Sequence, residues 1–347
     1  MTETGRGLAR ARTMLDLKRH AEAASLLAGI VATDPGNGTA WCLLTLAHLG
    51  AGRNTDAAAA AERAIAAAPA SDWPYRLAST VQLRLDNTRA ALQAAEEARR
   101  LAPQEWRCHL CVAQATLATK ERFDDAEAAA AKARELAPNE PDVYLISGKV
   151  SLERGKRAEA RAYQERALAL DPEHVGAMNE LGKIRLRRLG GAAAAHHFAQ
   201  AARTAPRETA YGRNVDVAVR RAVASVIYIG SLGTLALNFL AVEAHLSRAQ
   251  ILLGLLVVLA VTAVVGAGQY LRMPAQARPL MRQRSSVLAL AVSYGAILAS
   301  AAILALSPAS ALPAAAFGVI VLLAVARLAA YRILRRKPDR APGTTSG

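Results

Sequence analysis

Aromatic residues are scarce in this chain, at 4% of its 347 residues, although 53% of the residues are hydrophobic. A β-sandwich or barrel builds its core from aromatic and β-branched strands, so this composition argues against one and favours alanine-rich helices. Only three cysteines are present, namely Cys42, Cys108 and Cys111. An odd and low count argues against a disulfide framework and suits a reducing compartment.

The sequence motifs of common catalytic and cofactor sites are also absent. The chain has no P-loop, no GxGxxG after a strand, no HExxH, and no GxSxG in a strand–turn–helix context. The segment Cys108-His109-Leu110-Cys111 has the spacing of a redox pair or of half a zinc site. No second pair supplies the remaining zinc ligands, so we favour the alternative that both thiols are small packing residues on a helix. The sequence therefore predicts no enzymatic activity, no cofactor and no metal.

Six prolines recur at nearly fixed intervals along the first 208 residues. The steps between them are 34, 34, 35, 34 and 34 residues, and the prolines are Pro35, Pro69, Pro103, Pro138, Pro172 and Pro206. Each proline follows an alanine-rich helical pattern and ends it, because proline lacks an N–H and disfavours helix at the preceding residue. A period of this length indicates one helix–turn–helix unit repeated six times.

The residues around these prolines resemble the tetratricopeptide repeat, which has a bulky residue at position 4, a small one at 8, alanine at 20 and 27, and proline at 32. The bulky position holds Trp41, Tyr75, Tyr144 and Met178, and the small position holds Thr45, Ser79, Gly148 and Gly182. The alanine positions hold Ala57 and Ala64, Ala91 and Ala98, Ala126 and Ala133, Ala160 and Ala167, and Ala194 and Ala201. The resemblance implies an all-α, right-handed solenoid of about six repeats over residues 1–208. The fourth unit has one extra residue, which we expect in the turn around Lys120.

In tetratricopeptide arrays the first helix of each unit lines the concave face, so the resemblance implies which side chains lie there. They are Trp73, Arg76, Arg84, Arg107, Leu110, Lys149, Leu152, Asn179, Lys183 and Arg187. This predicted basic groove would suit an extended or helical peptide that carries carboxylates, because arginine pairs well with them. Charged residues on a solvated helix face are also ordinary, and that alternative stays open. The few aromatics for base stacking argue against a nucleic-acid partner.

Four apolar blocks follow the repeats, at about residues 222–242, 251–271, 286–306 and 312–331. Each is about 20 residues long, which is the length a helix needs to cross a hydrocarbon core of about 30 Å. Glycines within them, such as Gly230 and Gly254, favour close packing of membrane helices. The sequence therefore predicts a capping helix or linker over 209–221, a four-helix transmembrane domain over 222–334 and a basic tail over 335–347.

Positive charge lies at alternate ends of these blocks, in a chain whose net charge is +15. Arg213, Arg220 and Arg221 precede the first block, and further basic residues fill the second loop and the tail, whereas the first and third loops together hold only Arg248. The positive-inside rule then predicts that both termini and the repeats are cytoplasmic. The polar N-terminal segment shows no signal peptide. The high alanine and arginine content suggests a bacterium, and hence the plasma (inner) membrane.

These features predict a non-catalytic, membrane-anchored scaffold that binds a protein or peptide client through its cytoplasmic repeats. Four spans exceed what an anchor needs, so we also expect the membrane domain to bind a membrane-protein partner or a second copy of itself. Two other classes stay open. The chain could be an accessory subunit of a transport or envelope-assembly complex, or a small transporter with a regulatory solenoid, although no charged residue lies near the bilayer centre to support transport.

Overall fold

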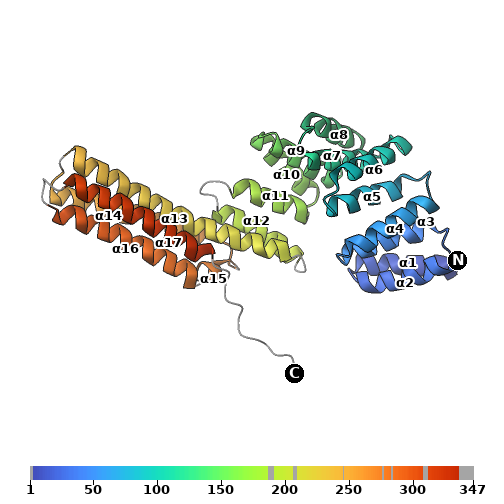
Figure 1. Ribbon diagram of the computed structural model, residues 1–347, viewed down its shortest axis with the longest axis horizontal. Coiled ribbons are helices and arrows are strands. Elements are labelled where there is room, and N and C mark those ends of the chain that lie inside the picture. The colour runs from blue at the N-terminus through green and yellow to red at the C-terminus, as the bar shows by residue number, and fades with distance from the viewer. Residues whose placement is uncertain are drawn as a thin grey trace, which may run out of the picture. The chain divides into compact units, whose positions relative to one another are not determined.

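The structure is a computed structural model that describes residues 3–186, 191–205, 209–244, 246–275, 277–282, 284–307 and 312–335. The regular elements throughout these ranges are helices, and none of the described residues lies in a β-strand. The chain divides into two compact units, Met1–Pro172 and Glu173–Gly347 (Figure 1). The predicted all-α fold class is thereby confirmed.

The first unit contains five helix pairs in succession. They are α1 (Glu3–Asp16) with α2 (His20–Thr33), α3 (Gly38–Gly50) with α4 (Asn54–Ala67), α5 (Asp72–Arg84) with α6 (Thr88–Leu101), α7 (Trp106–Thr119) with α8 (Phe123–Leu136), and α9 (Pro141–Glu153) with α10 (Arg157–Leu170). Each helix packs against its partner, and each of the first four pairs also packs against the first helix of the next pair. The extra residue of the fourth unit lengthens α7, and the turn after it keeps three residues.

The first helices of neighbouring pairs also contact one another: α1 touches α3, α3 touches α5, α5 touches α7, and α7 touches α9. Within residues 3–172 the second helices make no comparable contact with each other. The first helices therefore form the tighter, inner layer of the unit, and the second helices form the outer layer. This arrangement agrees with the predicted assignment of the concave face to the first helices.

Alanine at the two predicted positions of the second helices is completely buried. Each of these residues has 0% of its surface exposed: Ala57, Ala64, Ala91, Ala98, Ala126, Ala133, Ala160, Ala167, Ala194 and Ala201. A methyl group at such a position lets the neighbouring helix approach closely, whereas a longer side chain would force the two apart. The repeated alanines thus set the spacing between the two layers.

A hydrogen bond ties the bulky position of several repeats to the turn before it. Trp41 donates its indole N–H to the carbonyl of Pro35 at 2.8 Å, and the Tyr144 hydroxyl donates to the carbonyl of Pro138 at 2.9 Å. His109 occupies the equivalent place, with its Nε2 2.8 Å from the carbonyl oxygen of Pro103. In these three repeats the bulky position therefore holds the entry of the first helix against the preceding proline, and His109 is a member that the sequence did not predict.

The small position of each first helix is matched in size to the residue sixteen places later on the second helix. The pairs are Thr45 with Ala61, Ser79 with Ala95, Gly148 with Gln164, Gly182 with Phe198 and, with the one-residue insertion, Ala113 with Ala130. Glycine occurs where the partner is large: Gln164 and Phe198 lie directly over the two glycines. In these two repeats the glycine makes room for a partner that is larger than alanine.

Replacing Gly148 with alanine is expected to destabilise the first unit. The new Cβ would lie 2.2 Å from Nε2 of Gln164 and 3.1 Å from the carbonyl oxygen of Ala160. Overpacking costs about 1–3 kcal/mol, against roughly 1 kcal/mol that alanine gains over glycine inside a helix. Denaturant unfolding followed by circular dichroism measures the difference.

The double variant Gly148→Ala/Gln164→Ala is expected to be more stable than the sum of the two single changes predicts, because it reproduces the alanine pair of the fourth repeat. Gly29→Ala is the matched control. Gly29 is exposed on α2 with no atom near the position of an added Cβ, so this change should stabilise by about 0.5–1 kcal/mol. Simple additivity of the two single changes would contradict the size-matching argument.

The second unit begins with the sixth helix pair, α11 (Val175–Arg185) and α12 (Gly191–Thr204). The predicted capping helix and the first apolar block form one continuous helix, α13 (Thr209–Glu243), of 35 residues. The first turns of α13 pack against α12, and Asn214 donates its side-chain N–H to Oδ1 of Asn179 on α11 at 2.7 Å. Gly191 lies so close to Ala218 and Ala222 that a Cβ would clash with their backbone. The start of α13 therefore packs on the sixth helix pair, and its role as a separate capping segment over 209–221 stays a prediction.

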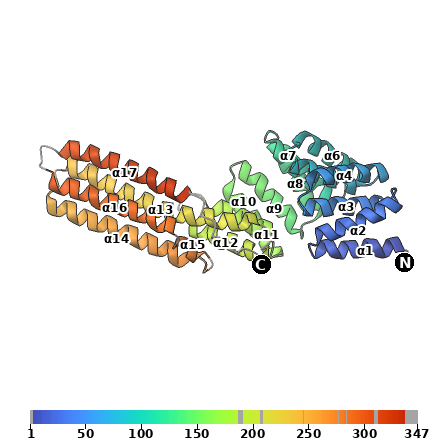
Figure 2. The ribbon, with the colours of Figure 1, turned by 60° about the horizontal axis from the view of Figure 1, so that its bottom comes forward.

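The remaining helices form an apolar bundle with α13 (Figure 2). They are α14 (Arg248–Arg272), the short α15 (Arg278–Met281), α16 (Arg284–Leu306) and α17 (Leu312–Arg335). Glycine again marks close contacts, because a Cβ on Gly230 would clash with Thr262 and Ile297, and one on Gly254 would clash with Leu237. These contacts confirm that small residues mediate the packing of α13 with α14 and α16.

Three helical segments are long and apolar enough to cross a membrane: Thr209–Glu243, Arg248–Arg272 and Ala314–Leu334. In α16 the described apolar stretch, Ser286–Ser300, is shorter than a full span. The structure thus supports three of the four predicted spans, and the fourth stays a prediction. The boundaries proposed at residues 208, 221 and 334 also stay predictions, and the tail from residue 336 lies outside the described residues.

Candidate functional site

The candidate site is the inner layer of the first unit, where α5, α7 and α9 hold most of the predicted groove residues. Trp73 is partly buried and packs against the buried cluster of Cys42, Ala64 and Leu77, so its indole forms part of the wall rather than a free anchor. Arg84, at the end of α5, is exposed, and no carboxylate among the described residues forms an ion pair with it. Arg84 is therefore an exposed cation of this layer that has no local carboxylate partner in the described part of the chain.

Three of the predicted basic residues already have an acidic neighbour on their own helix or its cap. Arg76 Nε lies 2.6 Å from Asp72 Oδ2, Arg107 Nη1 lies 3.1 Å from Glu105 Oε1, and Lys183 Nζ lies 2.7 Å from Glu180 Oε1. The surface is thus less positive than the sequence analysis proposed. Partly exposed pairs of this kind contribute little free energy, so a carboxylate on a client could exchange with the local one.

The structure does not place all predicted groove residues on a shared open surface. Leu110 is only 8% exposed and belongs to the hydrophobic core around Ala113 and Val143, so it is a core residue and not a contact residue. Asn179 is hydrogen-bonded to Asn214 of α13, and it belongs with Lys183 to the second unit. Lys149 is partly buried on α9, and Arg187 lies outside the described residues.

A row of partly buried leucines on the same helices was missed by the sequence analysis, apart from Leu152. Leu49, Leu83, Leu117 and Leu152 occupy equivalent places at the ends of α3, α5, α7 and α9. Their spacing of 34, 34 and 35 residues follows the proline period, so the repeat register itself was the signal that could have identified them. Together they give the inner layer an apolar stripe beside Arg84, which suits an amphipathic peptide.

The three cysteines are packing residues. Cys42 and Cys108 are buried, and Cys108 Sγ donates to Asp72 Oδ2 at 3.6 Å. Burial raises the pKa of the Cys42 and Cys108 thiols to about 12 and that of the Cys111 thiol to about 11. Reactive cysteines need a lowered thiol pKa, because the thiolate is the nucleophile. Among the described residues no group of three histidine, cysteine or acidic side chains could hold a metal ion.

Alkylation should distinguish this packing role from a redox role. At pH 8 the folded protein is expected to react with iodoacetamide at all three cysteines at least about tenfold more slowly than the urea-unfolded protein, because pKa values of about 11 and 12 leave almost no thiolate. Mass spectrometry of tryptic peptides measures each site. Rapid labelling of Cys108 or Cys111 in the folded protein would reopen the redox interpretation.

Comparison with known proteins identifies the fold but no family. No protein-family model and no curated protein matches the chain. A tetratricopeptide repeat protein from Parabacteroides merdae ATCC 43184 is similar with a TM-score of 0.55 and 15% identity, over 62% of this chain and 84% of its own. The APC/C hetero-tetramer Cut9–Hcn1 gives a TM-score of 0.53 at 15% identity, over 62% of this chain and 42% of that one.

A third similar structure is TTC0263, a thermophilic tetratricopeptide repeat protein in Thermus thermophilus, at 20% identity and a TM-score of 0.48, over 52% of this chain and 98% of its own. At 15% identity, the two matches with TM-scores above 0.5 show the fold and not the function. The chain is an α-solenoid of the tetratricopeptide type, followed by apolar helices.

Proposed function

We propose that this chain is a non-catalytic membrane scaffold that recruits a protein or peptide client through its helical repeats. The tetratricopeptide-type solenoid supports the scaffold part, since such stacked helices present an extended concave surface for binding. The apolar helices support the membrane part. The two parts rest on different observations and are tested separately.

The observation that carries the membrane part is the apolar outer surface of the bundle. Among the described residues, Leu17 is the only exposed large hydrophobic residue before α13, whereas α13, α14, α16 and α17 expose many, including Leu253 at 63% and Phe317 at 69%. Buried in the same bundle are Thr234 and Thr262, whose hydroxyls donate to backbone carbonyls one turn earlier. Apolar side chains outside and satisfied polar groups inside suit a lipid solvent and not water.

Charge supports one orientation of this bundle. Arg220 and Arg221 lie near the start of its first span, Arg272 ends the second, and Arg332 lies near the end of α17. Consecutive spans run in opposite directions, so these positions share one end of the bundle. The other end has only Arg248 as a basic residue among the described residues. By the positive-inside rule, the arginine-rich end faces the cytoplasm, and the repeats lie on that side.

Membrane insertion and orientation can be tested on the full chain. We expect it to stay with the membrane pellet in alkaline carbonate. A membrane-impermeant maleimide should label Ala249→Cys in intact spheroplasts but Gly212→Cys only after lysis. Both sites are exposed, and a side chain at Gly212 meets no neighbouring atom. The unchanged protein, whose thiols have raised pKa values from burial, is the control for background labelling. Labelling in the opposite order would contradict the orientation.

The inner layer of the first unit is the proposed client site. Its leucine row offers apolar contact area, Arg84 directly follows Leu83 of that row, and Arg107 is an exposed cation at the start of α7. This combination suits an amphipathic segment that carries carboxylates. Partner capture should therefore depend on charge on the first helices and be indifferent to charge on the second helices.

The double variant Arg84→Glu/Arg107→Glu should reduce recovery of the client from native membranes about tenfold, since two attractive contacts become repulsive. The matched control is Arg99→Glu/Arg100→Glu, which makes the same charge change on the outer helix α6. Pulldown in mild detergent with quantitative mass spectrometry measures both. Equal recovery with the two double variants, or no loss with either, would exclude the inner layer as the client site.

A further inference from the structure

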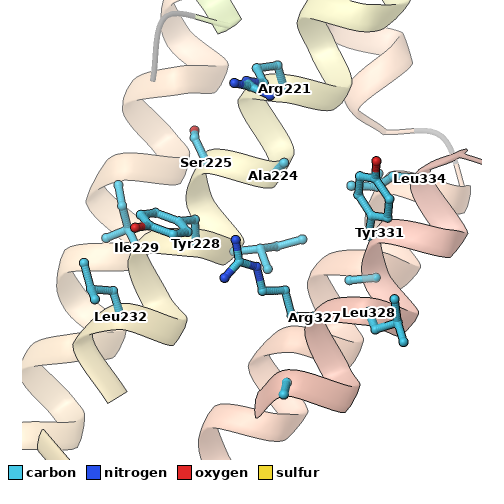
Figure 3. A pocket seen from close by; sticks show the side chains of 13 residues that line it. Arg221, Ala224, Ser225, Tyr228, Ile229, Leu232, Arg327, Leu328, Tyr331 and Leu334 are labelled. Atoms are coloured by element: carbon cyan, nitrogen blue, oxygen red, sulfur yellow. The ribbon is translucent and has the colours of Figure 1, made fainter. Parts of the chain in front are cut away.

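A groove of about 1000 Å³ lies between α13 and α17 in the apolar bundle (Figure 3). Helix α13 lines it with residues from Arg221 to Leu232, and α17 lines it with residues from Ala324 to Leu334. Its volume is at the upper end of the range for ligand sites. Alanine at 224 and 324 leaves room between the helices, since larger side chains at these positions would fill the space.

One arginine on each of the two helices lines this groove. Figure 3 shows Arg221 on α13 and Arg327 on α17, with the guanidinium of Arg327 directed towards Tyr228. The Arg327 Cζ lies 5.1 Å from the centre of the Tyr228 ring, a cation–π contact that holds the guanidinium across the groove. No aspartate or glutamate lines the groove, and no described carboxylate forms an ion pair with either arginine. Two cations thus face one space without a counter-charge from the described residues.

The rest of the lining is mostly apolar, and it lies on both sides of Arg327 along the helices. Ile229 and Leu232 continue along α13, and Leu328 lies beside Arg327 on α17. Arg327 precedes the end of α17 at Arg335 by eight residues, or about 12 Å along the helix axis. An occupant therefore needs an anionic part that reaches the two guanidiniums and an apolar part that lies along the helices.

We propose that this groove binds an anionic phospholipid, with the headgroup phosphate between Arg221 and Arg327 and an acyl chain along the apolar wall. The proposal rests on the membrane location proposed above, because a membrane contains anionic phospholipids next to the groove. Guanidinium groups bind phosphate oxygens in a bidentate manner, and the Tyr228 hydroxyl is a further donor on the lining. Basic pockets between membrane helices on the cytoplasmic side are sites at which anionic headgroups bind.

The test uses the full chain in mild detergent, with binding measured by native mass spectrometry and by the shift in unfolding temperature. Phosphatidylglycerol, phosphatidylcholine and inorganic phosphate are added in separate experiments. We expect phosphatidylglycerol to bind and stabilise at least about tenfold more effectively than either of the others. Equal effects of the two lipids, or an equal effect of inorganic phosphate, would overturn the proposal.

Variants locate the site. Arg221→Gln and Arg327→Gln should each weaken phosphatidylglycerol binding about fivefold, whereas Arg332→Gln should change it less than about twofold. Arg332 is the matched control because it is an exposed arginine on the same helix, one turn from Leu328, and does not line the groove. Equal losses in all three variants would indicate nonspecific charge attraction and overturn the site.

A photo-crosslinker at Leu328 distinguishes the remaining occupants. In native membranes a phospholipid adduct is expected, and an adduct to another protein or to a second copy of the chain would overturn the lipid assignment. Carbonate extraction of each variant distinguishes a failure of the proposed membrane location from a failure of the proposed lipid site. Loss of the protein from the membrane pellet would count against the proposed membrane location itself, whereas retention without a lipid preference would count against the groove alone.

Discussion

Close approach of helix backbones is the constraint on which both units depend. In the repeats it is met by alanine, which is fully buried at positions such as Ala57 and Ala64. In the apolar bundle it is met by glycine, with Gly230 against Thr262 and Gly254 against Leu237. Small residues serve a different purpose in each unit. In the repeats they allow a compact core in water. In the apolar bundle they allow dispersion contacts between helices, which no hydrophobic force draws together in lipid.

Much of the repeat fold could be predicted from the sequence, because the proline period sets where the helix pairs begin and where the two alanine positions of each second helix lie. The candidate site was less predictable. Leu110 has the sequence position of a groove residue, yet the packing of α7 against its neighbours turns it into the core. The pairing of Arg76 with Asp72 could have been predicted from their spacing of four on one helix. Asn179 is hydrogen-bonded to Asn214 because α13 packs beside α11, and no local sequence pattern predicts that packing.

The groove between α13 and α17 was beyond sequence reasoning for a similar reason. Arg221 lies just before an apolar block, and such a position indicates the orientation of a membrane helix. Arg327 lies inside another apolar block, near its end, where an arginine side chain can extend to the membrane interface. Only the antiparallel packing of the two helices brings them to one space, and Tyr228 then fixes the direction of Arg327. Each arginine has its own explanation in the sequence, and only the packing of α13 against α17 gives the two a shared site.

The continuity of α13 has a mechanical consequence. Its 35 residues form a rod of about 52 Å, of which one end is fastened to the sixth repeat and the rest belongs to the apolar bundle. A flexible tether would let the repeat move independently of the bundle, as glycine–serine linkers do. A rod transmits torque instead, so a load or rotation applied to the sixth repeat reaches the helices that line the α13–α17 groove without first being absorbed by slack chain.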